Sequence, residues 1–270
     1  MVADTGQSPD ELVSRRRMST QIEMTGVSKI NTLSVRAFGA CVSLAFAGFV
    51  NAAVIDFEAF DPGRIIDDEY APVVLIHGSN FRYDVSEPRA IIFDTANPTG
   101  GDIDLGGPFN SNNPELADNF SPGNVLIIQE RDDCDFQTGF CATPDDEGRR
   151  PAGEFEFVFS ADVVLETIDF FDIEAAENSQ NPDSEIRLYD ADGLEIQPGN
   201  WFVPGTGGDN MWDRLDFGAI EGVRSFVIEL NGSGAIDNVT YTMSPVPVPA
   251  SVWLFGSALG FLGWARQRSR

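Results

Sequence analysis

The sequence predicts an all-β protein in which a single β-sandwich lies between two apolar end segments. Three observations support this: apolar and polar residues alternate along many short segments, turn-forming residues separate those segments, and no internal repeat is present. Alternation with a period of two is typical of strands that are buried on one face. About ten short strands with frequent turns favour a sandwich over a propeller or a solenoid.

Strand predictions follow this alternation along the chain. Glu154–Phe159 places three phenylalanines on one face of a strand, and Ser225–Leu230 alternates in a similar way. The segment Ile186–Ile196 predicts a hairpin around a tight turn. Two long surface loops are expected at Asn97–Gly123 and Asp132–Gly153. The remaining predicted strands are Val54–Phe57, Val73–His77, Ala90–Phe93, Val125–Glu130, Val163–Phe171, Leu215–Phe217 and Val239–Met243.

Residues 1–52 have the layout of a secretory signal peptide. Two basic residues precede the apolar stretch Ala37–Val50, and small residues then favour cleavage near Ala52. The polar beginning of the chain fits this layout poorly. Met18 or Met24 is therefore the alternative start of translation, and either would give a signal peptide of ordinary length. The segment predicts export of the domain that follows it.

The other end of the chain predicts a short transmembrane helix. Its apolar run, Ser251–Ala265, is shorter as a helix than the bilayer core of roughly 30 Å, so it spans only with local thinning. Arg266, Arg268 and Arg270 follow at once, and basic residues remain on the cytoplasmic side. The preceding domain is therefore expected outside the cytoplasm.

A proline-rich motif precedes that helix. Prolines at alternate positions favour an extended, exposed chain that a protease can bind. The motif consists of Val246, Pro247, Val248, Pro249 and Ala250.

The order of motif, apolar helix and basic end resembles the C-terminal sorting signal of PEP-CTERM proteins, in its Val-Pro-x-Pro-Ala variant. The resemblance implies export, temporary retention in the inner membrane and processing by an exosortase. It also implies a setting among extracellular polysaccharides. The alternative is a proline linker before a simple membrane anchor.

The charge of the central region excludes several partners. Residues 53–248 contain 39 acidic and 9 basic residues, none of them lysine. Such a charge repels nucleic acid and anionic lipid, so neither is an expected partner. It suits an extracellular protein that takes up divalent cations, or one that acidity simply keeps soluble.

Two cysteines in the central region, Cys134 and Cys141, are expected to form a disulfide. Nearby cysteines usually pair outside the cytoplasm. The spacing is not that of a Cys-x-x-Cys redox motif. A zinc site is not expected either, because His77 is the only histidine in the chain.

The two ends of the predicted domain carry similar acidic motifs. It opens with Val54-Ile55-Asp56-Phe57-Glu58 and closes with Ile236-Asp237-Asn238. These ends resemble jelly-roll domains of the carbohydrate-binding and galactose-binding-like kind. The resemblance implies that the first and last strands are neighbours, often with a structural Ca²⁺ between them. Asp56, Glu58 and Asp237 are the candidate ligands. The alternative is that these acids are solvated residues beside the core.

Other motifs point to binding rather than to catalysis. No Gly-x-Ser-x-Gly motif is present. Acidic residues are so abundant that no one pair of carboxylates can be singled out as catalytic, so an enzyme is not predicted. Trp201 and Trp212 lie in loop-like settings, where each is either a platform for a sugar ring or a core residue.

The chain is therefore predicted to have three parts: a signal peptide at 1–52, a β-sandwich at 53–244 and a sorting signal at 245–270. The predicted function is that of a secreted cell-surface or extracellular-matrix protein with a structural or adhesive role. The alternative is a carbohydrate-binding module for extracellular polysaccharide, and a secreted hydrolase is less favoured.

Overall fold

The computed structural model describes residues 52–146, 150–174, 184–197, 201–244 and 250–268. Nine of the strands in these residues form one antiparallel sheet, and two form a separate hairpin, which confirms the predicted all-β fold. The elements are β1 (Ala52–Ile55), β2 (Val74–Asn80), β3 (Ala90–Asp94), β4 (Asn124–Ile128), β5 (Cys134–Asp135), β6 (Phe140–Cys141), β7 (Gly153–Phe171), β8 (Glu185–Tyr189), β9 (Trp201–Phe202), β10 (Trp212–Leu230), β11 (Ala235–Met243) and α1 (Ala250–Arg268).

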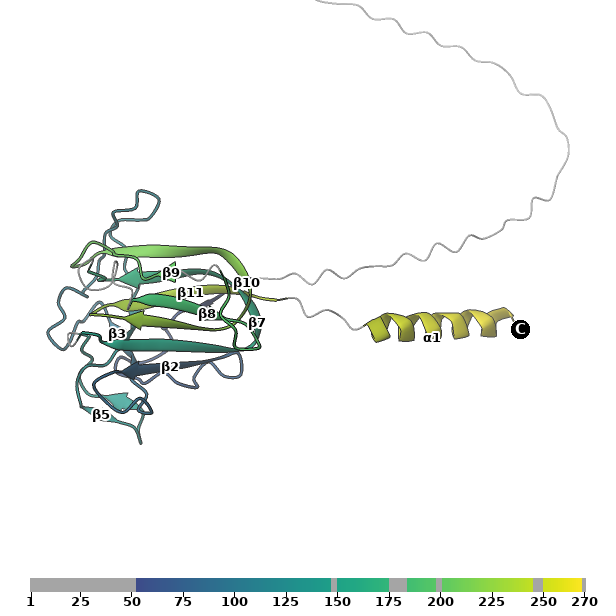
Figure 1. Ribbon diagram of the computed structural model, residues 1–270, viewed down its shortest axis with the longest axis horizontal. Helices are drawn as coiled ribbons and strands as arrows, with labels where there is room; N and C mark the ends of the chain where they lie inside the picture. The colour runs from purple at the N-terminus through teal and green to yellow at the C-terminus, as the bar shows by residue number, and fades with distance from the viewer. Residues whose placement is uncertain (1–51, 147–149, 175–183, 198–200, 245–249, 269–270) are drawn as a thin grey trace, which may run out of the picture. The chain divides into compact units, whose positions relative to one another are not determined.

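The long strands β7 and β10 contribute to both layers of the sandwich. The first half of β7, Gly153–Phe159, pairs with β2 and with the second half of β10. The second half of β7, Val163–Phe171, pairs with β11 and with the first half of β10. Register shifts in β10 between Asp216 and Ser225 accompany the change of direction. Figure 1 shows both long strands curving at the same end of the domain. One sheet is thus folded onto itself.

The sequence predicts each of these long strands as two separate strands, and this is wrong. Glu154–Phe159 and Val163–Phe171 both lie in β7, and Leu215–Phe217 and Ser225–Leu230 both lie in β10. Ser160 and Asp162, on either side of the small residue Ala161, interrupt the apolar alternation of β7 in the sequence. Bulges allow a strand to continue through such an interruption, because the extra residues need no ladder partner.

The two layers enclose the larger hydrophobic core. Phe155, Phe157 and Phe159 point inward from β7 and are buried, as their alternation predicts. Phe157 stacks on Phe226 with 4.5 Å between the ring centroids. Phe159 lies 5.0 Å from the ring of Tyr241 on β11, a contact that joins the two layers.

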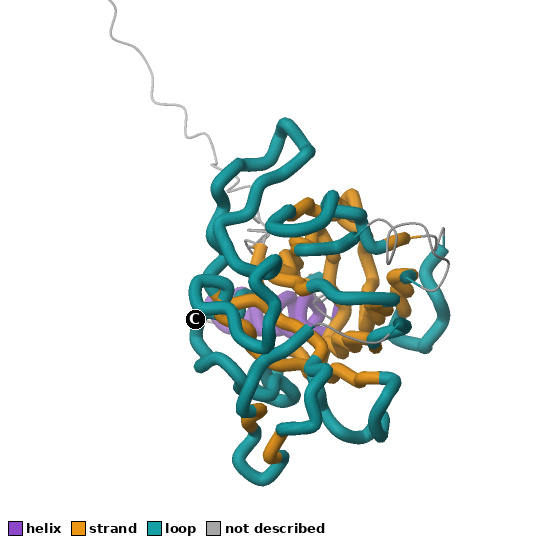
Figure 2. Tube along the Cα trace, turned by 90° about the vertical axis from the view of Figure 1, so that its left-hand side faces the viewer, coloured by secondary structure: helices purple, strands orange, loops and turns teal. Residues whose placement is uncertain are grey.

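A second hydrophobic cluster lies on the opposite face of β3 and β4. Ile91 and Phe93 belong to this outer cluster, whereas Ile92 faces the inner core. Leu105 and Phe109, from the segment predicted as a surface loop, are fully buried there. Figure 2 shows loops crossing in front of the strands. The loop is therefore a packed cover, which explains why both faces of β3 and β4 are apolar.

The pairing of the first and last strands is confirmed. β1 runs antiparallel to β11, with Ala52 opposite Thr242 and Ile55 opposite Val239. This pairing brings the segment that follows β1 beside the middle of β11, which positions the acidic residues considered below.

The helical conformation of the predicted C-terminal segment is confirmed as α1, which has Arg266 and Arg268 in its last turn. Large apolar side chains of this helix, such as Phe255 and Phe261, are exposed. Within the described part of the chain, no helix has both the length and the apolarity needed to cross a membrane. Residues 1–51 of the predicted signal peptide (1–52), the motif residues 246–249 and Arg270 lie outside the described residues.

Candidate functional site

The structure brings the three predicted calcium ligands into one region. Asp56 follows the end of β1, Glu58 lies two residues further on, and Asp237 lies on β11. Asp237 is buried, with 2 % of its surface exposed. Its direct cross-strand partner on β7 is Asp169, which is fully buried. Asp169 was not among the ligands predicted from the sequence, because the pairing of β7 with β11 is not visible in the chain order. We call these four acids the terminal-strand site.

Burial of Asp237 raises its pKa to about 8. A hydrogen bond from the Asn238 backbone opposes this shift, while the charges of Asp169, Glu58 and Asp56 add to it. These influences show that the carboxylates lie close enough to repel one another. The site therefore favours a proton or another positive charge at Asp237.

Polar contacts hold several of these groups in place. The backbone N–H of Asn124 donates to Glu58 Oε1 (2.8 Å). A side chain at Gly123 would clash with the same carboxylate, because its Cβ would lie 2.3 Å from Oε1. The hydroxyl of Tyr70 donates to the carbonyl oxygen of Asp56. Burial raises the pKa of Tyr70, and the charges of Asp56 and Asp237 raise it further, so this hydroxyl keeps its proton at neutral pH.

Asp169 already has cationic and polar partners. Arg214 forms a two-pronged ion pair with it, in which Nη2 lies 2.7 Å from Oδ2. The amide of Asn238 donates both to Asp169 Oδ2 (3.1 Å) and to Asp237 Oδ2 (2.9 Å). Asp237 Oδ1, by contrast, is buried and accepts no hydrogen bond from the described residues. A further positive group would be stabilised at this oxygen.

The chemistry of the terminal-strand site fits a hard cation such as Ca²⁺, which prefers carboxylate and carbonyl oxygens. Across the described ranges, however, no three His, Cys, Asp or Glu side chains are already arranged to hold a metal ion. The side chains of Asp56 and Glu58 are exposed. Binding would therefore require these two carboxylates to turn toward Asp237 Oδ1.

A second acidic cluster is buried among the loops. The backbone N–H of Asp146 donates to Asp102 Oδ2 (3.0 Å), and the N–H of Gly234 donates to Asp146 Oδ2 (3.0 Å). Burial raises the pKa of Asp146 well above its ordinary value, and the charges of Asp102 and Asp172 add to the shift. The three acids come from loops far apart in the sequence, so their spacing in the chain gave no signal of the cluster.

The predicted disulfide is confirmed, and it closes a hairpin that the sequence analysis placed inside a long loop. Cys134 on β5 lies opposite Cys141 on β6, and the two sulfurs are bonded. Two-residue strands leave almost no alternation in the sequence, so the hairpin could not be predicted. A disulfide of this kind is typical of proteins in oxidising compartments.

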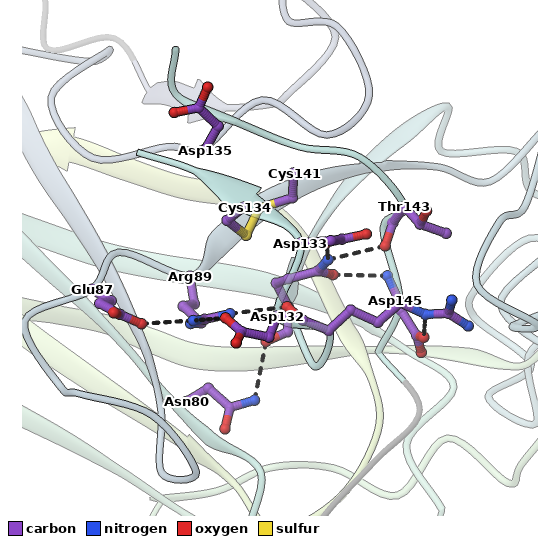
Figure 3. Close-up of a disulfide and its surroundings, with 12 residues drawn as sticks. Asn80, Glu87, Arg89, Asp132, Asp133, Cys134, Asp135, Cys141, Thr143 and Asp145 are labelled. Carbon is purple, nitrogen blue, oxygen red and sulfur yellow. Dashed lines mark hydrogen bonds and ion pairs between the residues drawn. A yellow bond between two sulfur atoms is a disulfide. The ribbon is translucent and has the colours of Figure 1, made fainter. Parts of the chain in front are cut away.

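A buried arginine anchors the base of this hairpin. Figure 3 shows Arg89 between Glu87 and Asp132, close to the disulfide. Its Nη2 lies 2.6 Å from Glu87 Oε2 and 3.3 Å from Asp132 Oδ1. Its guanidinium carbon lies 3.6 Å from the centroid of the Tyr83 ring and 5.6 Å from that of Phe136. These contacts fasten the hairpin to the sandwich, so the disulfide belongs to the packed domain.

The two tryptophans proposed as sugar platforms occupy different environments. Trp212 is 3 % exposed, its Nε1 donates to the carbonyl of Ala117 (3.0 Å), and its ring lies 4.5 Å from Phe120. Of the two alternatives for Trp212, the structure shows the core residue, because the folded loop covers the ring. Trp201 is partly buried and packs against the inner core, 5.1 Å from the ring of Phe217.

Comparisons with known proteins give no family for this chain. No protein-family model matches it, and no curated protein matches it. Among solved structures, a fucose binding module of Streptococcus pneumoniae is 13 % identical over 44 % of this chain and 80 % of its own, with a TM-score of 0.23. Wild-type discoidin II of Dictyostelium discoideum is 10 % identical over 45 % of this chain and 49 % of its own, with a TM-score of 0.26. TM-scores this low do not establish a shared fold, so the fold of this chain is assigned from its own strand pairing.

Proposed function

We propose that this protein is exported and has a non-catalytic, structural or adhesive role in an extracellular polysaccharide matrix. The observation that carries the proposal is the disulfide between Cys134 and Cys141, which suits an oxidising compartment. The acidic composition of the domain and the absence of lysine from residues 53–248 suit a soluble surface protein outside the cell.

The C-terminal segment is proposed to be the sorting signal of the exported protein. The helix α1 begins at Ala250, the last residue of the Val-Pro-x-Pro-Ala motif, and ends among arginines. Its exposed apolar side chains favour a partner that covers them, and the partner proposed here is an exosortase-type processing protease. Cleavage near the motif would separate α1 from the β-sandwich.

A structural Ca²⁺ at the terminal-strand site is the second part of the proposal. Asp56, Glu58 and Asp237 would hold the ion, with Asp237 Oδ1 as the buried ligand atom. The ion would neutralise carboxylates that otherwise repel one another, and it would fasten the start of the domain to its last strand. Its contribution would be to stability and not to catalysis.

The role in the matrix predicts that the protein associates with polysaccharide. Protein purified from its own cells should sediment with the extracellular polysaccharide of those cells. High salt should not release the protein, because the acidic domain and an acidic polymer repel each other, so that salt has no attraction between opposite charges to weaken. Sedimentation of labelled protein with and without the polysaccharide measures this. A protein that stays in the supernatant at every polysaccharide concentration would contradict the role.

The alternative function, a module specific for one sugar, gives a different result in the same experiment. A single free sugar or short oligosaccharide would then compete and return the protein to the supernatant. Loss of binding on replacing Trp201 by alanine would favour the alternative, because that ring is the partly exposed member of the predicted pair.

A further inference from the structure

One layer of the sandwich has an outward face whose residues are fixed by the strand registers. Alternation turns Phe155, Phe157 and Phe159 inward, so their neighbours on β7 point outward. One row across four strands consists of Leu75, Val158, Ser225 and Tyr189. The next row consists of His77, Glu156, Val227 and Arg187. In a third row Glu154 and Glu229 are partly exposed, whereas Ser79 at the β2 end of the row is buried. We call this surface of β9, β8, β10, β7 and β2 the outer sheet face.

An aromatic ring stands at the β9 end of this face. Phe202 is 42 % exposed and lies opposite Glu185 on β8. Its neighbour Trp201 packs against the inner core. Alternation therefore gives β9 one inward ring and one outward ring, and the outward one is Phe202. Phe202 was not among the candidates in the sequence, because composition alone does not tell which residue of a short strand faces the core.

Polar side chains on the next three strands of this face, β8, β10 and β7, accompany this ring. Arg187 Nη2 lies 3.4 Å from Glu229 Oε2. Burial lowers the pKa of the Arg187 guanidinium, but the charges of Tyr189 and Glu229 raise it above its ordinary value. Glu154 lies directly opposite Glu229 in the sheet. The face thus offers a guanidinium donor and carboxylate acceptors on the same side of the sheet as an exposed ring. Aromatic faces and such polar groups together match the apolar faces and hydroxyl groups of sugars.

The charge of the face decides between possible occupants. Four glutamates, at positions 154, 156, 185 and 229, stand against the single cation Arg187 among the residues placed on it above. An acidic polymer, an anionic membrane or a second copy of this chain, whose formal charge is −26, would be repelled. A polymer of neutral sugars brings no charge to this face and provides hydroxyl groups to its carboxylates.

We propose that the outer sheet face binds a linear polysaccharide of neutral sugars, with Phe202 stacked on one sugar ring and Arg187, Glu229 and Glu154 bonded to hydroxyl groups. This inference rests on the proposed polysaccharide function and adds the surface and the class of sugar. Neighbouring strands lie about 4.8 Å apart, so a polysaccharide that runs across the strands passes a new strand about every 4.8 Å.

Affinity electrophoresis of the purified protein in gels that contain a neutral β-glucan, a neutral galactomannan or acidic alginate tests the inference. Retardation by a neutral polymer is expected, and Phe202→Ala should weaken it by about 3- to 10-fold, the value of one aromatic contact. The matched control is Phe136→Ala, because Phe136 is 40 % exposed but lies on the disulfide hairpin. Melting of both variants shows whether they remain folded.

Three results would overturn the inference. Retardation by alginate alone would show that the face does not select neutral sugars. Equal retardation of the Phe202→Ala variant and the native protein would place the sugar elsewhere. Sedimentation with the native matrix but no retardation by any neutral polymer would leave the proposed function standing and remove the assignment to this face.

Discussion

Replacing both Cys134 and Cys141 by serine is expected to lower the free energy of unfolding by about 2–3 kcal/mol. The disulfide joins residues 7 apart in the sequence. Closing so short a loop lowers the conformational entropy of the unfolded chain, which accounts for this free energy. The hairpin is fastened to the sandwich through Arg89, so its loss should loosen the domain as a whole. Urea unfolding of the native and double-variant proteins under oxidising conditions measures the change.

The control for the disulfide is Gln137→Ala, an exposed residue inside the same closed loop, which should leave the midpoint unchanged. Adding a reductant should destabilise the native protein and not the double variant. A native protein whose midpoint does not respond to the reductant or to the double substitution would contradict the stabilising role of the bond.

Without divalent metal, replacing Asp237 by asparagine is expected to raise stability at pH 8 by about 1–3 kcal/mol, because the amide carries no charge that burial and the neighbouring carboxylates oppose. Burial raises the pKa of this carboxyl to about 8. The folded protein therefore holds the proton more tightly than the unfolded chain does. Stability from this group is fully present below about pH 4 and is lost as the pH rises to about 8. The variant should lack this part of the pH dependence.

Calcium should act in the opposite direction on the native protein. Because Ca²⁺ binds the ionised carboxylate, it should raise the melting temperature at pH 8, and a chelator should lower it again. Asp237→Asn should not respond, whereas Asp192→Asn, a change at an exposed carboxylate in a turn, should respond like the native protein. Identical melting of the native protein with calcium and with chelator would remove the metal from the proposal.

Much of the fold is present in local patterns of the sequence. The phenylalanines of β7 and the apolar residues of the second half of β10 alternate clearly, because a half-buried strand needs one apolar face. The neighbourhood of β1 and β11 was accessible only through the resemblance of the domain ends, because pairing between distant strands leaves no periodic signal. The sequence did not predict β7 as one strand, because Ser160 and Asp162 interrupt the apolar alternation at its bend.

The candidate sites show the same division. Asp56, Glu58 and Asp237 were found in the sequence because they lie at the ends of the predicted domain. Asp169 was missed, because its position opposite Asp237 follows from a register that only the folded sheet fixes. The two alternatives for Trp212 could not be separated in the sequence for a similar reason: the loop that covers the ring resembles a surface loop in composition but packs as part of a second core.

The outer sheet face illustrates a further limit. Trp201 and Phe202 are neighbours in the sequence, and their composition alone favours the tryptophan as the sugar-binding ring. One residue of register decides which ring faces solvent, and that register depends on the pairing of β9 with β8. Aromatic platforms in short strands are therefore assigned from the structure.

The most direct test of the central claim is the mass of the protein recovered from its own cells. The account predicts an extracellular form that has lost residues 1–52, ends within or near 246–250, and contains oxidised Cys134 and Cys141. A chain that retains α1 and both reduced cysteines, recovered from inside the cells, would contradict export and with it the proposed role in the matrix.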